Sequence, residues 1–389
     1  GAPHRPADSR EIASAAVQTR PGALLALFLV LAAPAFAGAP QVGGSAYLVE
    51  NATTGDVVLA KNARLRVPIA SITKLMTVLV VLEHERLDSV VTVTGAAAAR
   101  GESSIFLKPG ERLTVRELVQ AALIQSANDA AAALADHVGG GDRAAFVDMM
   151  NAKARSLGLR DTRFANPDGL DAPGNYSSAR DVTKLARVAM RNPAIRGIVR
   201  RTDATISGGR RLKTWNDLLY AFPGLLGVKT GHTGGAGWSQ VAAAQGPGFV
   251  VYATLLGEPT RVRRNGDLTR LLAWGISQFR QMPIVKAGRT YATAALPYDK
   301  GRLGLVAARD QMRVLRLGKP VTEEVVSPST VSLPVTKGQR LGSVRVYRQG
   351  RLIASSPLVA SRAVTAPSLL GRVGWYASET VDNVFDWVS

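Results

Sequence analysis

The chain has 389 residues, 46% hydrophobic and 20% charged, a composition typical of folded globular proteins and not of disordered or fibrous ones. It contains no cysteine, which excludes disulfides, thiolate catalysis and cysteine-based zinc sites. The formal net charge is +19, but no basic-aromatic stripe or recognition motif accompanies it, so we expect no nucleic-acid partner; an acidic cell-surface polymer explains the charge equally well.

The first segment of the chain has the features of an export signal. Three arginines precede a short apolar run at 23–33, and Ala35-Phe36-Ala37 supplies a small-x-small cleavage pattern. The apolar run is about half of the roughly 20 residues that a membrane span needs. We therefore predict a cleaved signal peptide over 1–37 rather than an N-terminal anchor, and a protein that works outside the cytoplasm.

Strand and helix patterns follow between residues 40 and 282. Alternating apolar residues at 46–49 and 57–60 flank turn formers, which predicts a hairpin, and an almost unbroken apolar run predicts a buried helix that begins near Ser71. Further helices are expected over 113–125, 129–137, 143–157, 178–191 and 265–278, and further strands over 238–244 and 249–256. Strands, then many helices, then strands and a closing helix indicate an α+β fold.

The pattern changes after Met282. Short β-rich runs separated by turn formers predict a small all-β domain over 283–365, with strands near 312–317, 331–334, 341–347 and 352–354. The final segment, 366–389, places apolar residues on one helical stripe and contains aromatic residues that suit a membrane interface. We expect an amphipathic helix at a membrane surface; the alternative is a helix that docks on its own domain.

Ser71 and Lys74 are three residues apart, so they lie on one face at the start of the predicted buried helix. A lysine beside apolar residues at the positive end of the helix dipole is penalised as a cation, which lowers its pKa and makes it a better base. A neutral amine within reach of a hydroxyl is what an activated serine nucleophile requires. Alone, the pattern recurs by chance about once in a chain of this size, and a capping serine with an outward lysine explains it better.

Two later segments change that interpretation. Ser126-Ala127-Asn128 lies between two predicted helices, and Lys229-Thr230-Gly231 opens the later strand region. In this order, S-x-x-K, S-x-N and K-T-G form the three-part active-site signature of penicillin-binding proteins and serine β-lactamases. The residue types suit acyl transfer, in which one serine attacks a carbonyl, a lysine takes its proton, and a second serine–lysine pair relays a proton to the leaving amine.

Longer segments resemble the low-molecular-mass penicillin-binding proteins that are D-alanyl-D-alanine carboxypeptidases. They are 66–77, 103–118, 164–181, 227–233 and 334–347. The resemblance implies an α+β fold in which a penicillin-binding or β-lactamase-like domain, an antiparallel sheet with helices plus a helical subdomain, is followed by a small all-β domain. It also implies the family's layout: signal peptide (1–37), catalytic domain (40–282), β-sandwich-like domain (283–365) and C-terminal amphipathic anchor (366–389).

The resemblance assigns roles to the motif residues. Ser71 would be the acylated nucleophile and Lys74 its general base. Ser126 and Asn128 would assist proton transfer and hold the substrate amide, and Lys229 would support the second proton relay.

The substrate-binding residues implied by the resemblance are Thr230, Gly231, His232 and Arg264. Thr230 would contact the terminal carboxylate of the substrate, and the backbone N–H groups of Ser71 and His232 would form the oxyanion hole. The family also offers an arginine to the carboxylate. Arg264 fits best, with Arg261 and Arg263 near enough to compete.

Three other functions share part of this pattern. A class A β-lactamase needs a glutamate between the second and third motifs, and no glutamate occurs between Glu117 and Glu258. A DD-endopeptidase that cuts cross-links usually lacks the second domain that 283–365 would form. A catalytically idle wall-binding protein has no reason to keep every motif residue.

We therefore predict a serine-type D-Ala-D-Ala carboxypeptidase that removes the terminal D-Ala from peptidoglycan pentapeptide stems. β-Lactams would acylate Ser71. The four histidines have no metal-binding spacing, and we expect neither a metal nor a cofactor. The protein would act in the periplasm or at the outer face of the bacterial cytoplasmic membrane.

Overall fold

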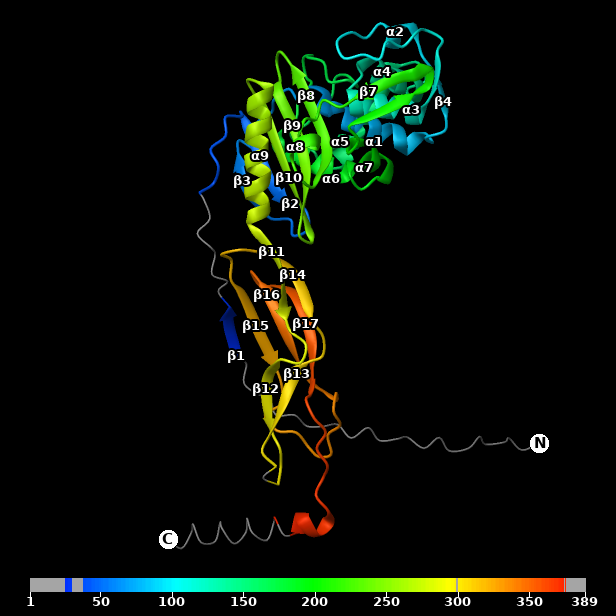
Figure 1. Ribbon diagram of the computed structural model, residues 1–389. Helices are drawn as coiled ribbons and strands as arrows, with labels where there is room; N and C mark the ends of the chain where they lie inside the picture. The colour runs from blue at the N-terminus through cyan, green and yellow to red at the C-terminus, as the bar shows by residue number, and fades with distance from the viewer. Residues whose placement is uncertain (1–24, 30–37, 299, 374, 376–389) are drawn as a thin grey trace, which may run out of the picture. The chain divides into compact units, whose positions relative to one another are not determined.

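The computed structural model describes residues 25–29, 38–298, 300–373 and 375 (Figure 1). The rest of the predicted signal peptide, and residues 374 and 376–389 of the predicted C-terminal helix, lie outside these ranges. The chain forms two compact units. The larger holds residues 38–281 with 314–317, and the smaller holds most of the described residues from 282 on, together with β1 (Leu25–Leu29).

The larger unit is built around a five-stranded antiparallel sheet in the order β3-β2-β10-β9-β8. Its strands are β2 (Ala46–Asn51), β3 (Val57–Lys61), β8 (Leu225–Thr233), β9 (Gly237–Gly246) and β10 (Phe249–Glu258). The hairpin predicted at 46–60 is confirmed as β2 and β3. The order leaves β8 at one edge of the sheet and β3 at the other.

Both faces of this sheet are covered. Ala242 packs with Leu268 and Leu271 of α9 (Arg261–Ser277) on one face, whereas the next residue, Ala243, belongs to the core on the other face. Successive residues of a strand point to opposite faces, and the small side chain of alanine lets helices approach the sheet closely on both faces.

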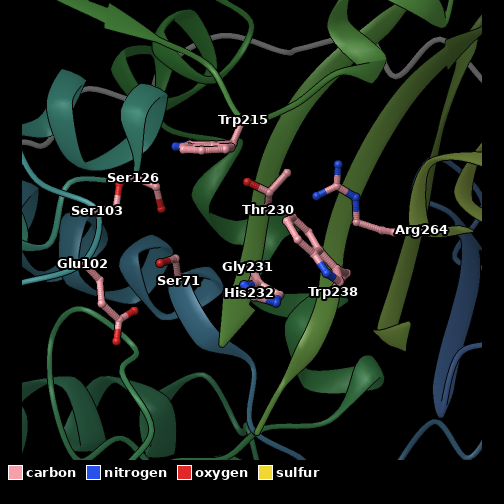
Figure 2. Close-up of a pocket in the computed structure, with 10 residues that line it drawn as sticks. All are labelled: Ser71, Glu102, Ser103, Ser126, Trp215, Thr230, Gly231, His232, Trp238 and Arg264. Atoms are coloured by element: carbon pink, nitrogen blue, oxygen red, sulfur yellow. The ribbon is translucent and has the colours of Figure 1, made fainter. Parts of the chain in front are cut away.

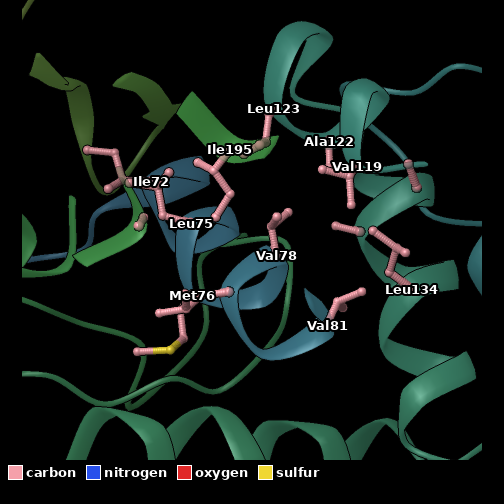
Figure 3. Close-up of a cluster of buried hydrophobic side chains, with 14 of the residues drawn as sticks. Ile72, Leu75, Met76, Val78, Val81, Val119, Ala122, Leu123, Leu134 and Ile195 are labelled. Atoms are coloured by element: carbon pink, nitrogen blue, oxygen red, sulfur yellow. The ribbon is translucent and has the colours of Figure 1, made fainter. Parts of the chain in front are cut away.

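The second face carries the helical part of the unit, whose centre is α1 (Lys74–His84). This helix is buried from Lys74 to Val81, which explains why its sequence is an apolar run rather than a stripe. Figure 3 shows its apolar side chains packed toward those of neighbouring helices. The other helices here are α2 (Gly95–Ala98), α3 (Val115–Gln120), α4 (Asn128–Val138), α5 (Arg143–Ser156), α6 (Ala179–Ala189) and α7 (Pro193–Val199). The short α8 (Leu218–Ala221) instead packs Leu218 into the cluster of α9. An antiparallel sheet with a helical subdomain confirms the predicted α+β class.

The single helix predicted over 113–125 is divided in the structure. β5 (Arg112–Thr114), which pairs with β4 (Val90–Thr92), comes first, followed by α3 and a π-helical turn over Ala121–Gln125. The break comes at Thr114, whose side chain caps α3 in a capping box with Glu117. The segment 203–213, for which no element was predicted, forms the hairpin of β6 (Asp203–Ile206) and β7 (Arg210–Lys213).

The smaller unit is a six-stranded antiparallel sheet in the order β1-β15-β16-β17-β13-β12. Its strands beyond β1 are β12 (Thr290–Ala295), β13 (Arg302–Ala307), β15 (Val321–Val326), β16 (Arg340–Arg348) and β17 (Arg351–Ala360), and β11 (Phe279–Val285) pairs separately with β14 (Gln311–Arg316). The strand predicted at 331–334 is wrong. The two ends of this segment bond to different parts of the chain, Val331 N to the Ala295 carbonyl and Val335 N to the Val364 carbonyl, so no continuous ladder forms.

The described part of the C-terminal segment begins a helical turn at 369. Its apolar side chains are largely exposed: Leu369 at 79%, Leu370 at 86% and Val373 at 67%. Across the described ranges, the structure contains no helix with the length and apolarity that crossing a bilayer requires.

Candidate active site

Ser71 lies in a 3-10 turn, Ala70–Thr73, that leads directly into α1. Ala70 before it has φ +48°, a left-handed conformation that is strained for a residue with a Cβ. Two glycines fit closely around this turn. A Cβ on Gly169 would lie 2.0 Å from the Ala70 carbonyl oxygen, and one on Gly231 would lie 2.6 Å from that of Ile69. The backbone around Ser71 is therefore held from two sides at positions where only glycine fits.

Lys74 Nζ lies 2.8 Å from Ser71 Oγ, 2.7 Å from Asn128 Oδ1 and 2.7 Å from the Asp168 carbonyl oxygen. The orientation of the Asn128 amide is set by its other end, since Nδ2 donates to the Gly101 carbonyl at 2.9 Å. Two partners of Lys74 can thus only accept hydrogen bonds. A neutral amine would donate to these two and turn its lone pair toward the Ser71 hydroxyl.

Burial favours that neutral form. Lys74 is fully buried, and its desolvation lowers its pKa to about 7, although the charges of Asp168 and Glu102 act in the opposite direction. The predicted lowering of this pKa is confirmed, with burial as its main cause. At neutral pH a substantial fraction of Lys74 can take a proton from Ser71.

A second serine–lysine pair faces the first. Lys229 Nζ, from β8, lies 2.8 Å from Ser126 Oγ and 2.9 Å from the Thr230 carbonyl oxygen. Ser126 ends the π-helical turn in a left-handed conformation (φ 66°, ψ 28°), which directs the chain into α4 at Asn128. Burial, together with the charges of Lys74 and Arg264, holds the pKa of Lys229 well below its ordinary value.

These groups meet at a pocket of about 200 Å³ beside the edge strand β8 (Figure 2). Its lining contains Ser71, Glu102, Ser103, Ser126, Trp215, Thr230, Gly231, His232, Trp238 and Arg264. Three predicted residues, Lys74, Asn128 and Lys229, are buried and do not line the pocket. Lys74 contacts the pocket residue Ser71, and Lys229 contacts the pocket residue Ser126. The imidazole of His232 is exposed and stacks on Trp238, with ring centroids 4.0 Å apart.

The three candidate arginines occupy different places at the start of α9. Thr260 caps this helix, so it begins at Arg261 rather than at 265 as predicted. Arg264 is 1% exposed, lies over the ring of Trp238 and lines the pocket. Arg261 and Arg264 both contact the carboxylate of Asp217, Arg264 through Nη2 at 3.3 Å, but neither Arg261 nor the exposed Arg263 lines the pocket. Arg264 is thus the arginine that the structure brings to the pocket.

Several site residues were not identified from sequence. Trp215, whose indole Nε1 donates to the Gln125 carbonyl at 3.0 Å, and Glu102 line the pocket but belong to no motif. Asp171 accepts hydrogen bonds from Thr233 Oγ1 (2.7 Å) and Gly235 N (2.9 Å), which ties the loop at 166–176 to the end of β8. The sequence signals for this loop were its density of turn formers and its place within the resembling segment 164–181.

The chain matches two families in succession. Residues 34–260 match the Peptidase S11 family, described as D-alanyl-D-alanine carboxypeptidase, and residues 279–366 match the C-terminal domain of penicillin-binding protein 5. Over 329 residues it is 33% identical to the D-alanyl-D-alanine carboxypeptidase DacF of Bacillus subtilis, covering 81% of this chain and 84% of the relative. It is also 33% identical to DacC of Escherichia coli over 374 residues, 89% of this chain and 92% of the relative.

Solved structures agree with these matches. Penicillin-binding protein 6B from Escherichia coli is similar with a TM-score of 0.64 at 30% identity, over 85% of this chain and 99% of that one. Penicillin-binding protein 5 from Haemophilus influenzae is similar with a TM-score of 0.63 at 29% identity, over 84% and 99%.

Proposed function

We propose that this chain, which belongs to the D-alanyl-D-alanine carboxypeptidase family, works through an acyl-enzyme on Ser71 with Lys74 as general base. The chain is a serine-type carboxypeptidase of the penicillin-binding class, and its family acts on peptidoglycan stem peptides and binds β-lactams. The observation that carries the proposal is the pair of serine–lysine contacts, each 2.8 Å, whose two serines line one pocket.

In the first step, Lys74 takes the proton of Ser71, and Oγ attacks the carbonyl of the penultimate D-Ala. The backbone N–H groups of Ser71 and His232 would donate hydrogen bonds to the carbonyl oxygen and stabilise its negative charge. The close fit of Gly231 against the Ser71 turn supports this arrangement, since a Cβ there would lie 3.2 Å from Ser71 N.

The peptide bond then breaks, and the leaving D-Ala amine takes a proton through Ser126 and Lys229. Thr230 and Arg264 would hold its carboxylate, and the open edge of β8 would hold the extended peptide as an added strand. Water then hydrolyses the ester on Ser71, which releases the shortened stem and restores the hydroxyl.

β-Lactams would acylate the same serine, and we expect the adduct to be long-lived. Asp168 and Asp171, the acidic side chains of the loop at 166–176, are both engaged: Asp168 with Arg100 and Asp171 with the end of β8. Neither is therefore free to activate a deacylating water, in contrast to the glutamate of class A β-lactamases.

The test uses a labelled penicillin and a peptide that ends in D-Ala-D-Ala. Wild type should form a covalent adduct and release free D-Ala, Ser71→Ala should do neither, and Ser156→Ala, an exposed serine on α5, should behave as wild type. If no adduct and no D-Ala are found, or if Ser71→Ala equals wild type, the proposal is wrong.

The order of segments is proposed as export signal (1–37), catalytic domain (40–282), β-domain (283–365) and membrane-surface helix (366–389). The family matches at 34–260 and 279–366 support the two central boundaries, and the exposed apolar side chains at 369, 370 and 373 support the last segment. Deletion of residues 367–389 should move the protein from the membrane to the soluble fraction; an unchanged distribution would refute the anchor.

A further inference from the structure

A second cleft, about 880 Å³ in volume, opens on the larger unit and is lined by residues of β2, β3 and α6 and by the turn that follows α5. It shares no lining residue with the active-site pocket. Its charged lining residues are Glu50, Arg64, Arg160, Asp161, Arg180, Asp181, Lys184 and Arg187. Five basic and three acidic side chains give it a net charge of +2.

The acidic side chains of the cleft already have partners. Glu50 is paired with Arg187, and Asp161 is paired with Arg64, Nε to Oδ2, at 3.0 Å. Asp181 accepts hydrogen bonds from the backbone N–H of Asp161 at 2.7 Å and from the Thr162 hydroxyl at 2.8 Å. Glu50 and Asp161 thus each have an arginine as partner, whereas Asp181 is held by neutral donors. Glu50 also interacts electrostatically with Arg180, and the net charge of +2 counts all three carboxylates.

Three other cations line the cleft: Arg160, Arg180 and Lys184. Within the ranges that the structure describes, no hydrogen bond or ion pair involves their charged groups. Arg180 and Lys184 lie one turn apart on α6 and so share a face. Lys184 reaches the turn that carries Arg160, since a Cβ on Gly158 would lie 3.3 Å from Lys184 Nζ. All three residues are exposed, and all three line the cleft.

We propose that this cleft binds the free carboxylates of a second peptidoglycan stem peptide, one that is not in the active site. The inference rests on the proposed function, which makes this polymer the substrate. A net charge of +2 suits a peptide with one or two carboxylates better than a phosphate-rich polyanion. Leu48, Val57 and Ala60 also line the cleft, and they give apolar contact to the methyl groups of alanine residues.

As a consequence, the enzyme should act more readily on stem peptides that are attached to a glycan strand than on isolated peptides. Stems repeat along a glycan strand, so a stem held in the cleft keeps its neighbours at a high local concentration near the pocket. Arginine forms paired hydrogen bonds with a carboxylate, which explains why two of the three free cations are arginines.

The binding experiment uses full-length protein whose Ser71 is acylated with penicillin, and soluble peptidoglycan fragments with tripeptide stems, which lack the scissile bond. Titration calorimetry should show that the fragments bind to wild type. They should bind about tenfold more weakly to Arg160→Ala/Arg180→Ala/Lys184→Ala, because each ion pair between an exposed cation and a ligand carboxylate contributes modestly. The matched control is Arg191→Ala/Arg200→Ala/Arg201→Ala, which removes three exposed cations elsewhere and should bind as wild type. All three proteins should release D-Ala from a small soluble peptide equally, which also shows that the variants are folded.

Equal fragment binding by wild type and the cleft variant would overturn the inference. So would binding of phosphatidylglycerol vesicles that depends on the same three cations while the fragment does not bind, because the ligand would then be a lipid headgroup. Absence of D-Ala release by wild type from the small peptide would instead refute the proposed function, whatever the fragment does.

Discussion

Asp168 contacts Lys74 through its backbone carbonyl, at 2.7 Å, and not through its carboxylate. The carboxylate is fully buried and paired with Arg100, with Oδ2 2.5 Å from Nη2. Arg100 offsets part of the negative charge that Asp168 brings near the amine, yet this charge still raises the pKa of Lys74 against the larger, opposite effect of burial. This arrangement allows burial to determine the protonation of Lys74.

Acylation should depend on pH through this amine. Because the pKa of Lys74 is lowered to about 7 and the base must be neutral, the acylation rate should rise as pH increases through about 7 and then level off. Stopped-flow measurement of acylation by a chromogenic cephalosporin between pH 5 and 9 checks this. A rate that is flat across this range would exclude Lys74 as the titrating base.

Glu102→Gln should move that profile toward lower pH. The charge of Glu102 raises the pKa of Lys74, so its removal lets burial lower the pKa further and keeps the amine neutral in more acidic solution. Asp148→Asn, which removes an exposed carboxylate of α5, is the control and should leave the profile in place. A shift toward higher pH, or equal shifts in both variants, would contradict the assignment.

Gly231→Ala should abolish acylation, since its Cβ would lie 2.6 Å from the Ile69 carbonyl oxygen and push β8 away from Ser71. Gly234→Ala is a close control, because a Cβ at Gly234 meets no atom within 4 Å. Penicillin labelling and thermal unfolding should be measured together. If penicillin labels Gly231→Ala at the wild-type rate, acylation does not need the close approach of β8 to the Ser71 turn.

Arg264→Gln should weaken recognition of the terminal carboxylate. Loss of a buried charge-assisted hydrogen bond should reduce kcat/KM roughly tenfold to hundredfold for a free-acid peptide. The loss should be much smaller for the C-terminal amide of the same peptide, which separates recognition from misfolding. Arg263→Gln should leave both values unchanged; equal losses on acid and amide would argue against a role in recognition.

The motif residues could be placed from the sequence because their chemistry depends on short spacings. Ser71 and Lys74 are brought together by one helical turn, and Ser126 and Asn128 by adjacency. Trp215 and Glu102 could not be found this way, since they reach the pocket through tertiary packing alone. The sequence left three candidates for the arginine that binds the carboxylate. Packing of α9 on the sheet buries Arg264 at the pocket, whereas Arg261 and Arg263 are absent from the pocket lining.

The fold was predictable where apolar patterns are long. The buried run after Ser71 and the alternation in the first hairpin correspond closely to α1, β2 and β3. The prediction failed at Thr114, where a cap divides the segment, and at 331–334, whose two ends bond to different parts of the chain instead of to one strand.

The position of β8 at the edge of its sheet has a consequence for association as well as for catalysis. An unpaired edge strand is a template for aggregation, because it offers its backbone groups to any other extended chain. Here the edge faces a pocket of only about 200 Å³, closed on the other side by the Ser71 turn and by Ser126. A single peptide fits such a slot, whereas the edge of a second sheet, with further strands behind it, does not. The narrowness that positions the substrate also protects the protein from self-association along this strand.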